Sequence, residues 1–321
     1  MNFKPIIIVA GQPDSIFFEV FFKTLKKKKF KSPLILIASL KILNSQMKKF
    51  NFKKKVKLLD LKNLRKQKLN NKSINLIHVP SNFGHFRKNK IMISNLYIKN
   101  SFKLAFKIIK SGFSHKLING PINKSKFLNK KFLGITEYIS KSFKVKKVAM
   151  LIYNDEISVC PVTTHLPLKL VTKKINYLLI KDKIELINNF YIKNIGLKPK
   201  IAITGMNPHC ESISKLNEDT KILLPAVKRL KKKGYNVDGP IPADTVFLKQ
   251  NRARYNVILG MYHDQVLGPI KALKEYDAIN ITLGLPFYRI SPDHGPNEKM
   301  VNKNLSNPLS LIKSLRFLDK K

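Results

Sequence analysis

The sequence predicts an α/β fold with a largely parallel central sheet. Short apolar runs alternate with longer, Lys-studded segments of helical periodicity, as expected where strands and helices alternate along the chain. Gly and Pro follow several of the apolar runs, which is typical of buried strands that end in loops. The chain has 321 residues, of which 44% are hydrophobic. This is enough for one large domain, or two lobes, around an ample core.

The predicted strands are short and bounded by turn or polar residues. Because ligands of α/β folds collect beyond the carboxyl ends of the strands, functional residues are expected in the loops that follow these runs. We expect strands at Ile6–Ala10, Leu34–Ala38, Ile74–His78, Lys116–Asn119, Lys147–Ile152, Ile157–Val162, Lys200–Thr204, Val257–Met261 and Ala278–Leu283.

The helical segments are longer and carry charges on one side of an apolar periodicity. We expect helices at Ser15–Lys28, Ile98–Ser111, Lys169–Ile195, Asp219–Lys233 and, at the end of the chain, Leu309–Lys321. Gly234 directly follows the fourth of these, where it would cap the helix at its C-terminus. The weakly patterned stretch Lys48–Lys72 is interpreted as a surface segment with room for a short strand.

The formal charge of +43 raises the question of nucleic-acid binding. A basic footprint is normally concentrated on one face or one tail, whereas the 62 Lys and Arg residues are spread along the whole chain together with abundant Asn and Ile. Lys, Asn and Ile share AT-rich codons, so genome composition is a sufficient explanation. The distribution argues against a nucleic-acid function, although the charge favours anionic substrates.

Two further features of the sequence concern the cellular compartment of the protein. No run of 18 uncharged apolar residues occurs, so no membrane helix is expected, and Ile6–Ala10 is interpreted as a buried strand rather than part of a signal peptide. Cys160 and Cys210 are the two cysteines and form no CxxC pair. A reducing, cytoplasmic location is therefore expected.

Three histidines occupy short segments punctuated by turn residues: His165 in TTHLP, His209 in GMNPHCE and His263 in MYHDQ. Each follows an apolar run, at the point where a strand would end. Neutral imidazole is the commonest protein ligand for metals, and three protein ligands with one open position are typical of a catalytic site. His294 lies in a similar context. Cys210 could join such a site, but the alternative is a small core residue.

Acidic and cationic residues accompany these histidines. The acids are Glu211, Asp244, Asp264 and Asp293. A carboxylate could accept a proton or orient a ligand histidine, and for Asp244 the alternative is a helix N-cap. Lys271, Asn280 and Arg289 are candidates for holding a phosphate or carboxylate, against the alternative that any one of so many cations is a solvated surface charge. The common GxGxxG, GxxxxGK[ST], HExxH and GxSxG motifs are absent.

In combination, these segments resemble 4-hydroxythreonine-4-phosphate dehydrogenases of vitamin B6 biosynthesis. The resemblance rests on TTHLPL, GMNPHCE, GPIPADTVF, MYHDQ and NITLGLPFYRISPDHG, in this order, and on the earlier GQP, NGPINK and GITE segments. It therefore extends along the whole chain.

The resemblance implies a single catalytic unit, residues 1–321, of two α/β lobes in an α/β/α architecture similar to isocitrate and isopropylmalate dehydrogenases. It implies a homodimer with a shared active site between the lobes, NAD or NADP as cofactor, and one divalent metal (Zn, Mn, Co or Mg). The implied metal ligands are His165, His209 and His263. The implied catalytic residues are Asp244 and Lys271, and the implied contacts with a small phosphorylated hydroxy amino acid are Thr136, Lys271, Asn280 and Arg289. No residue is assigned to the nicotinamide cofactor.

The chain departs from the family pattern at a few positions. Ser15 and Phe17 stand where the family has glycines, Ile135 where it has a substrate-contacting histidine, and Pro296 where it has a threonine; the glycine of the family's NPHAGE segment is missing. Ile135 cannot donate a hydrogen bond. Two alternatives are therefore open: a dehydrogenase for a related phosphorylated acid, such as 4-phosphoerythronate or phosphothreonate, and a basic binding protein without activity.

Overall fold

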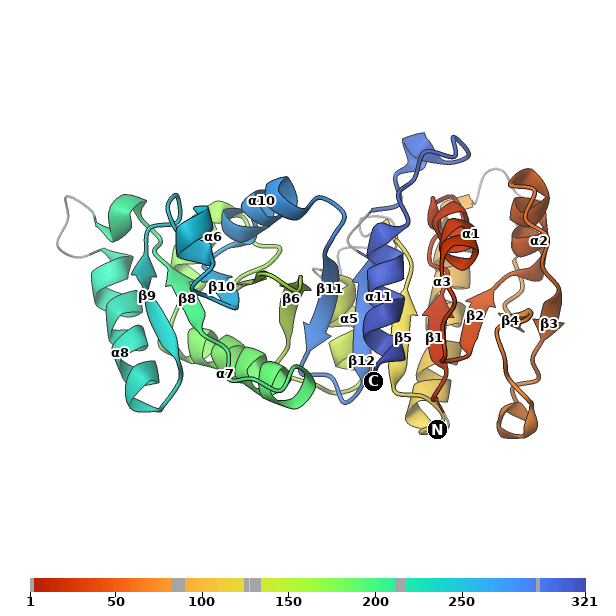
Figure 1. Ribbon diagram of the computed structural model, residues 1–321, viewed down its shortest axis with the longest axis horizontal. Coiled ribbons are helices and arrows are strands. Elements are labelled where there is room, and N and C mark those ends of the chain that lie inside the picture. The colour runs from red at the N-terminus through yellow and green to blue at the C-terminus, as the bar shows by residue number, and fades with distance from the viewer. Residues whose placement is uncertain (1–2, 82–89, 124–126, 128–133, 212–216, 293–294) are drawn as a thin grey trace. The chain divides into compact units, whose positions relative to one another are not determined.

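The protein consists of two compact units, each built of strands and helices (Figure 1). The computed structural model describes residues 3–81, 90–123, 127, 134–211, 217–292 and 295–321. Unit 1 comprises Met1–Ile135 and Pro286–Lys321, and unit 2 comprises Thr136–Leu285. The core of both units is made mainly of Ile, Leu, Val and Phe side chains on the strands and on the inner faces of the helices.

Unit 1 contains a parallel sheet with the strand order β3-β4-β2-β1-β5-β12. The helix α3 packs on β1, β2 and β5, and α11 packs on β12, β1 and α1. Its elements are β1 (Ile6–Val9), α1 (Phe17–Lys27), β2 (Leu34–Ala38), α2 (Leu40–Lys49), β3 (Val56–Leu58), η1 (Leu64–Lys66), β4 (Ile74–His78), α3 (Lys90–Lys110), β5 (Lys116–Asn119), β12 (Tyr288–Pro292), η5 (Glu298–Met300) and α11 (Leu309–Asp319).

Unit 2 has the strand order β11-β6-β7-β10-β8-β9, in which β6 runs antiparallel to both of its neighbours and the other pairs are parallel. Its elements are α5 (Ile135–Ser142), apart from the first residue, then β6 (Ala149–Tyr153), β7 (Ser158–Pro161), α6 (Leu168–Lys174), α7 (Tyr177–Asn194), β8 (Ile201–Thr204), η3 (Pro208–Cys210), the π-helical turn η4 (Asp219–Leu223), α8 (Leu224–Lys232), β9 (Val237–Ile241), α9 (Lys249–Arg252), β10 (Val257–Gly260), α10 (His263–Lys274) and β11 (Ile279–Leu283).

The predicted α/β class is confirmed, and all nine predicted strands are present with bounds shifted by at most two residues. The short strand β3 lies inside the weakly patterned stretch Lys48–Lys72. Two strands were not predicted. β9 contains Gly239 and Pro240, which resemble a turn in the sequence but are tolerated because β9 ends the strand order of its unit. β12 lies within GLPFYRISPDHG, where the turn residues Gly284 and Pro286 come shortly before the strand, and no strand is predicted there.

The prediction of a single helix at Lys169–Ile195 is wrong. This segment forms two helices, α6 and α7, which are separated at Ile175 and Asn176. The side chain of Asn176 accepts a hydrogen bond from the Leu179 backbone N–H at 2.9 Å and so begins a new helix. A continuous periodicity in the sequence does not reveal such an internal cap, because Asn also occurs on the solvated faces of helices.

The predicted helix Asp219–Lys233 begins as the π-helical turn η4 and becomes α-helical at Leu224. Pro225 is the second residue of α8, and it has no N–H to donate into the preceding η4 turn. Gly234 follows the end of this helix with a φ of +81°, which confirms the predicted C-terminal cap. α3 is longer than predicted and begins at Lys90. The helices α2, α5 and α10 were not predicted, and in α10 the internal Pro269 interrupts the helical pattern.

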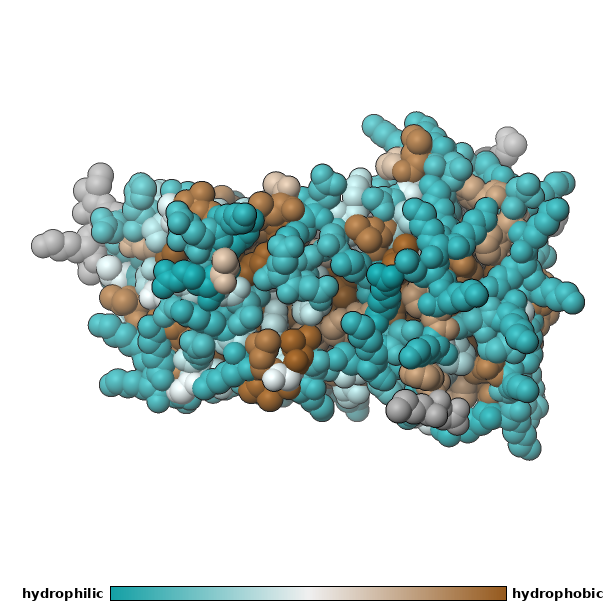
Figure 2. Space-filling model, viewed as in Figure 1, coloured by the Kyte–Doolittle hydropathy of each residue, from teal (hydrophilic) through white to brown (hydrophobic). Residues whose placement is uncertain are grey.

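Hydrophilic side chains are spread widely over the surface. Figure 2 shows hydrophilic side chains distributed over the visible face of both units rather than gathered in one patch. This agrees with the spread of Lys and Arg along the sequence. In the described part of the chain, no helix combines the length and apolarity that a membrane span requires.

The cap at the start of α7 provides a test of this local structure. Asn176→Ala removes the acceptor for Leu179 N–H and is expected to lower the free energy of unfolding by about 1 kcal/mol. Asn176→Asp keeps an acceptor at the same place and serves as the matched control. Thermal unfolding followed by circular dichroism measures both, and equal stability of the Ala and Asp variants would contradict the assignment of the cap.

Candidate active site

Two of the three candidate metal-binding histidines lie close together in unit 2. His165 follows β7 and His263 is the first residue of α10, and their ring centroids are 6.0 Å apart. Zinc–nitrogen bonds are about 2.0–2.1 Å long, so two imidazoles at roughly this spacing can bind one ion. Both side chains are half-buried. His165 and His263 therefore fit a shared metal site as a pair.

His263 is also oriented by a neighbouring acid. Its Nδ1 lies 2.6 Å from Oδ1 of Asp264. When a carboxylate accepts the proton of one ring nitrogen, the other nitrogen, Nε2, is left with its lone pair available for a metal. The Asp264 carboxylate thus has the position of a residue that orients a ligand histidine.

The loop that carries His165 is fixed to the end of β10. The N–H groups of Val162 and Thr163 donate to the carbonyls of Gly260 and Met261, at 2.7 and 3.2 Å. The Thr163 hydroxyl donates to the same Met261 carbonyl at 2.8 Å. These bonds continue the β7–β10 ladder beyond the strands, so the residues that follow each strand stay together.

A buried glutamine joins the end of β10 to the end of β8. Oε1 of Gln265 accepts from the Met261 N–H at 2.7 Å and from the Thr204 hydroxyl at 2.8 Å. Its Nε2 donates to the Gly205 carbonyl at 2.7 Å. One amide therefore connects the loops that carry His263 and His209. Gln265 within MYHDQ cannot be recognised from the sequence, since its role depends on contacts with residues about 60 positions away.

His209 lies on a separate turn after β8. It is exposed, occupies η3, and has a left-handed backbone with a φ of +56°. The preceding turn is held by Asp219, whose buried carboxylate accepts from the N–H groups of Met206 and Asn207 at 2.7 and 2.9 Å. Gly205 is required there, because a Cβ at this position would lie 2.6 Å from the Cys210 sulfur. Asp219 was not recognised as a site residue from the sequence.

The structure does not bring His209 into one group with the other two histidines. Among the described residues, no cluster of three or more His, Cys, Asp or Glu side chains could hold a metal ion. The pair His165–His263 is thus placed, whereas the complete triad with His209 stays a prediction.

Cys210 and Asp244 lie near the His209 turn. Burial raises the pKa of the Cys210 thiol to about 11, and the carboxylates of Asp219 and Asp244 add to the shift. The thiol is therefore neutral near pH 7 in the protein without a bound ion. Asp244 itself is exposed and is not a helix cap, since Leu248 occupies the N-cap position of α9.

The predicted substrate contacts of unit 2 come from three elements. Thr136 is half-buried near the start of α5, Lys271 is exposed on α10, and Asn280 lies on β11. The side-chain oxygen of Asn280 is buried without a hydrogen-bond partner among the described residues. Because buried polar atoms are nearly always paired, this acceptor is suited to a donor from a bound molecule.

Arg289 belongs to unit 1, where it lies on β12 and is only 3% exposed. Its Nε donates to Oδ1 of Asn119, at the carboxyl end of the neighbouring strand β5, at 2.8 Å. A buried guanidinium is costly unless it is paired and hydrogen-bonded, and its planar fork matches phosphate and carboxylate groups. Arg289 is therefore a fixed cation in unit 1.

The altered loop after β1 is packed. Phe17 is fully buried against Gly120, where a Cβ on the glycine would lie 2.7 Å from the Phe17 ring. The Ser15 hydroxyl donates to the Gln12 carbonyl at 2.7 Å. The Ile16 N–H donates to the Pro296 carbonyl at 3.2 Å. A backbone hydrogen bond thus joins this loop to Pro296, which is itself a departure from the family pattern.

The remaining candidates are Asp293, His294, Glu211 and Ile135. Asp293 and His294 lie outside the described residues. Glu211 is exposed directly after η3. Ile135 is only 6% exposed at the start of α5.

The fold and these loops define a class: an α/β protein whose polar candidates follow the carboxyl ends of parallel strands, with a pair of imidazoles suited to a metal. A protein from Sulfurihydrogenibium sp. (strain YO3AOP1), named 4-hydroxythreonine-4-phosphate dehydrogenase, is 37% identical over 249 residues, 76% of this chain and 75% of that protein. A protein of the same name from Aquifex aeolicus (strain VF5) is 32% identical over 323 residues and covers 98% of both chains.

A crystal structure of 4-hydroxythreonine-4-phosphate dehydrogenase from Klebsiella pneumoniae superposes with a TM-score of 0.83 at 26% identity, covering 99% of this chain and 98% of that one. The family model described as pyridoxal phosphate biosynthetic protein PdxA matches residues 29–318. The chain belongs to this family. The prediction of a family of oxidoreductases is thereby confirmed.

Gln265 provides a test of how the site loops are held. Gln265→Ala leaves three buried polar groups without their partner and is expected to cost roughly 3 kcal/mol of unfolding free energy. This corresponds to a fall in Tm of about 6–12 °C. Calorimetry on the metal-free protein measures this fall in Tm. Gln250→Ala, at an exposed position of α9, is the matched control, and an equally small shift in both variants would refute the bridging role.

Proposed function

We propose that the chain catalyses the metal-dependent, NAD(P)-linked oxidation of 4-phosphohydroxy-L-threonine at its C3 hydroxyl. The product, a β-keto acid, then loses carbon dioxide to give 3-amino-2-oxopropyl phosphate, in pyridoxal phosphate biosynthesis. The observation that carries the proposal is the 6.0 Å spacing of the His165 and His263 rings in a chain of the PdxA family.

The metal-binding site would be formed by loops of unit 2. His165 and His263 provide two imidazoles, the second oriented by Asp264, and His209 would complete the set. A divalent ion bound there (Zn, Mn, Co or Mg) would supply Lewis acidity toward the oxygen atoms of the substrate.

The remaining residues would bind the substrate and move protons. Arg289 is a buried cation suited to a phosphate or carboxylate. The Asn280 oxygen accepts from a substrate donor, with Thr136 as a further contact. Asp244, which is exposed near the His209 turn, would accept a proton from the substrate. Lys271 would bind an anionic group of the substrate or return a proton to it.

NAD or NADP would accept the hydride from C3, so each turnover releases one reduced cofactor. No GxGxxG segment occurs in the chain, and binding through the usual dinucleotide fingerprint is therefore not proposed. The two cysteines are free, in keeping with a cytoplasmic protein. We further propose a homodimer with a shared active site, as the family resemblance implies.

The decisive experiment is an assay of NAD(P) reduction with 4-phosphohydroxy-L-threonine, with and without Zn, Mn, Co or Mg. His263→Ala is expected to lower kcat/KM by at least about 100-fold, because it removes a ligand of the metal. His78→Asn, on β4 of unit 1, is the matched control. Turnover that needs no metal, or that survives in His263→Ala, would contradict the proposal.

The role of Arg289 is tested separately. Arg289→Lys keeps the charge but loses the guanidinium fork, including the bond to Asn119. It is expected to raise KM for the phosphorylated substrate about tenfold or more, as measured by steady-state kinetics. Arg316→Lys, at an exposed position of α11, is the control. An unchanged KM in Arg289→Lys would show that the substrate is held elsewhere.

A second candidate is the same chemistry on a related phosphorylated acid, such as 4-phosphoerythronate or phosphothreonate. It is favoured by Ile135, an apolar side chain where the family has a histidine. The same assay decides between the two: a higher kcat/KM for one of these acids than for 4-phosphohydroxy-L-threonine selects the alternative.

A further inference from the structure

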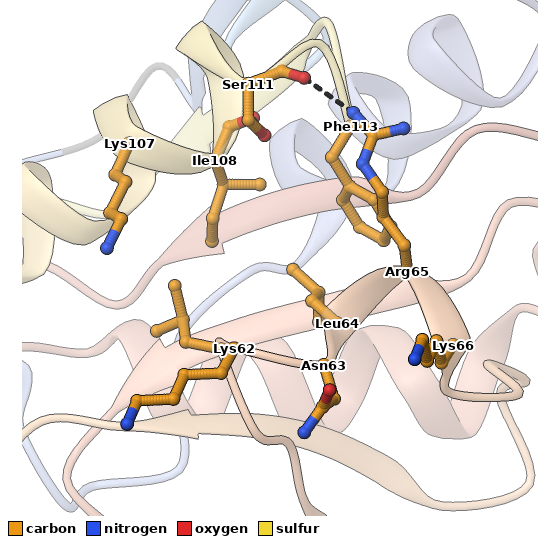
Figure 3. A pocket seen from close by; sticks show the side chains of 10 residues that line it. Lys62, Asn63, Leu64, Arg65, Lys66, Lys107, Ile108, Ser111 and Phe113 are labelled. Carbon is orange, nitrogen blue, oxygen red and sulfur yellow. Dashed lines mark hydrogen bonds between the residues drawn. The ribbon is translucent and has the colours of Figure 1, made fainter.

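Unit 1 contains a cavity that the proposed chemistry does not use. It lies between the segment joining β3 to β4 and the C-terminal end of α3, and its volume is about 310 Å³ (Figure 3). Its walls come from residues 61–66 and 107–113. This volume is at the lower end of the range of about 300–1,000 Å³ found for pockets that hold small organic ligands.

The cavity is lined by four cations. Lys62, Arg65, Lys66 and Lys107 contribute to the wall, and no Asp or Glu is among the ten lining residues. In Figure 3, Lys62 and Lys107 lie toward one side of the cavity and Arg65 and Lys66 toward the other. A low-dielectric wall lined by charges of one sign attracts counter-ions, so the cavity favours an anion.

The floor of the cavity is apolar. Leu64 and Ile108 are 6% and 2% exposed, and the half-buried Phe113 ring closes the wall beside them. Scattered surface lysines bind inorganic anions loosely, whereas an apolar floor contributes affinity only for a ligand that has an apolar part. Pockets that combine an apolar lining with a few polar groups are typical of organic ligands.

Hydrogen bonds hold the walls in place. The Arg65 guanidinium donates to the Ser111 carbonyl at 2.6 Å, which ties η1 to the end of α3. The nearby Asp60 carboxylate accepts from the Lys62 N–H at 2.9 Å and from the Asn63 side chain at 2.7 Å. Asp60 therefore shapes the loop from outside the lining.

Within unit 1, the cavity lies toward the amino end of β5, because its lining includes Phe113, in the short segment between α3 and Lys116. Asn119 and Gly120, by contrast, stand at and beyond the carboxyl end of that strand. A ligand in the cavity would not occupy the loops that follow the carboxyl ends.

We propose that this cavity is a binding site for a small amphipathic organic anion, with an aromatic or aliphatic body on Leu64, Ile108 and Phe113 and a phosphate, sulfonate or carboxylate group among the four cations. The proposal is independent of the catalysed reaction, because none of its residues belongs to the candidate active site.

The test uses the fluorescent anion 8-anilinonaphthalene-1-sulfonate as the probe, titrated into the full-length protein. Saturable binding is expected, and the double variant Lys62→Glu/Lys107→Glu is expected to weaken it by about tenfold or more, since two attractive charges become repulsive. Lys41→Glu/Lys49→Glu, which reverses two exposed charges on α2 of the same unit, is the charge-matched control. N-phenyl-1-naphthylamine, which lacks the sulfonate, is expected to bind more weakly than the anion.

The outcomes separate the possibilities. Loss of binding in the cavity variant alone supports the site. An equal loss in both double variants indicates attraction to the general surface charge, and unchanged binding in both places the probe elsewhere; either result overturns the proposal, as does the absence of saturable binding to the unmodified protein. Neither double variant is expected to change NAD(P) reduction, so failure here is distinguishable from failure of the proposed activity.

Discussion

The arrangement of the candidate site in unit 2 depends on the buried amide of Gln265. Its oxygen accepts two hydrogen bonds, from the end of β10 and from Thr204 on β8, and its nitrogen donates one to Gly205. A neutral amide can do both, whereas a carboxylate has no donor for the Gly205 carbonyl. An unpaired buried amide is costly. The three bonds therefore allow one relative position of the two strand ends and disfavour others.

The end of β10 is also joined to the loop that follows β7. The Met261 carbonyl accepts from both the N–H and the hydroxyl of Thr163, while the Met261 N–H is taken up by Gln265. Met261 is thus bonded on both sides, two residues before His263 and close to the loop of His165. The spacing of the two imidazoles follows from the strand register, with Asp264 setting the orientation of one ring. The loop of His209 is fixed instead by Asp219, on its own turn, and this difference explains why the pair is formed while the third histidine stands apart.

Much of this arrangement could be predicted from local sequence. Four-residue apolar runs such as Ile6–Val9 and Val257–Gly260 are buried strands, and a parallel sheet places the residues after such strands at one edge. What could not be predicted depends on partners distant in the chain. Gln265 resembles any polar residue in the first turn of a helix until Thr204 and Gly205 are placed beside it. The edge strand β9 is obscured by Gly239 and Pro240, and the break before α7 by an Asn that is equally common on helix surfaces. The distances between the three histidines depend on how the strands of the sheet are arranged. No single segment of the sequence contains that information.

The packing of the residues that depart from the family pattern shows how the structure accommodates them. If the loop after β1 had merely decayed, its larger side chains would be expected to point into solvent. Phe17 is instead fully buried against Gly120, whose lack of a Cβ leaves room for the ring, and Ile16 is bonded to Pro296, itself a departure. The larger side chain at position 17 is therefore accommodated by packing, as expected where a loop has been repacked rather than lost. Ile135 differs from these, because an apolar side chain can shape a site but cannot replace the hydrogen bonds of an imidazole. Any change in substrate preference relative to the family is therefore expected to depend on Ile135 more than on the repacked loop.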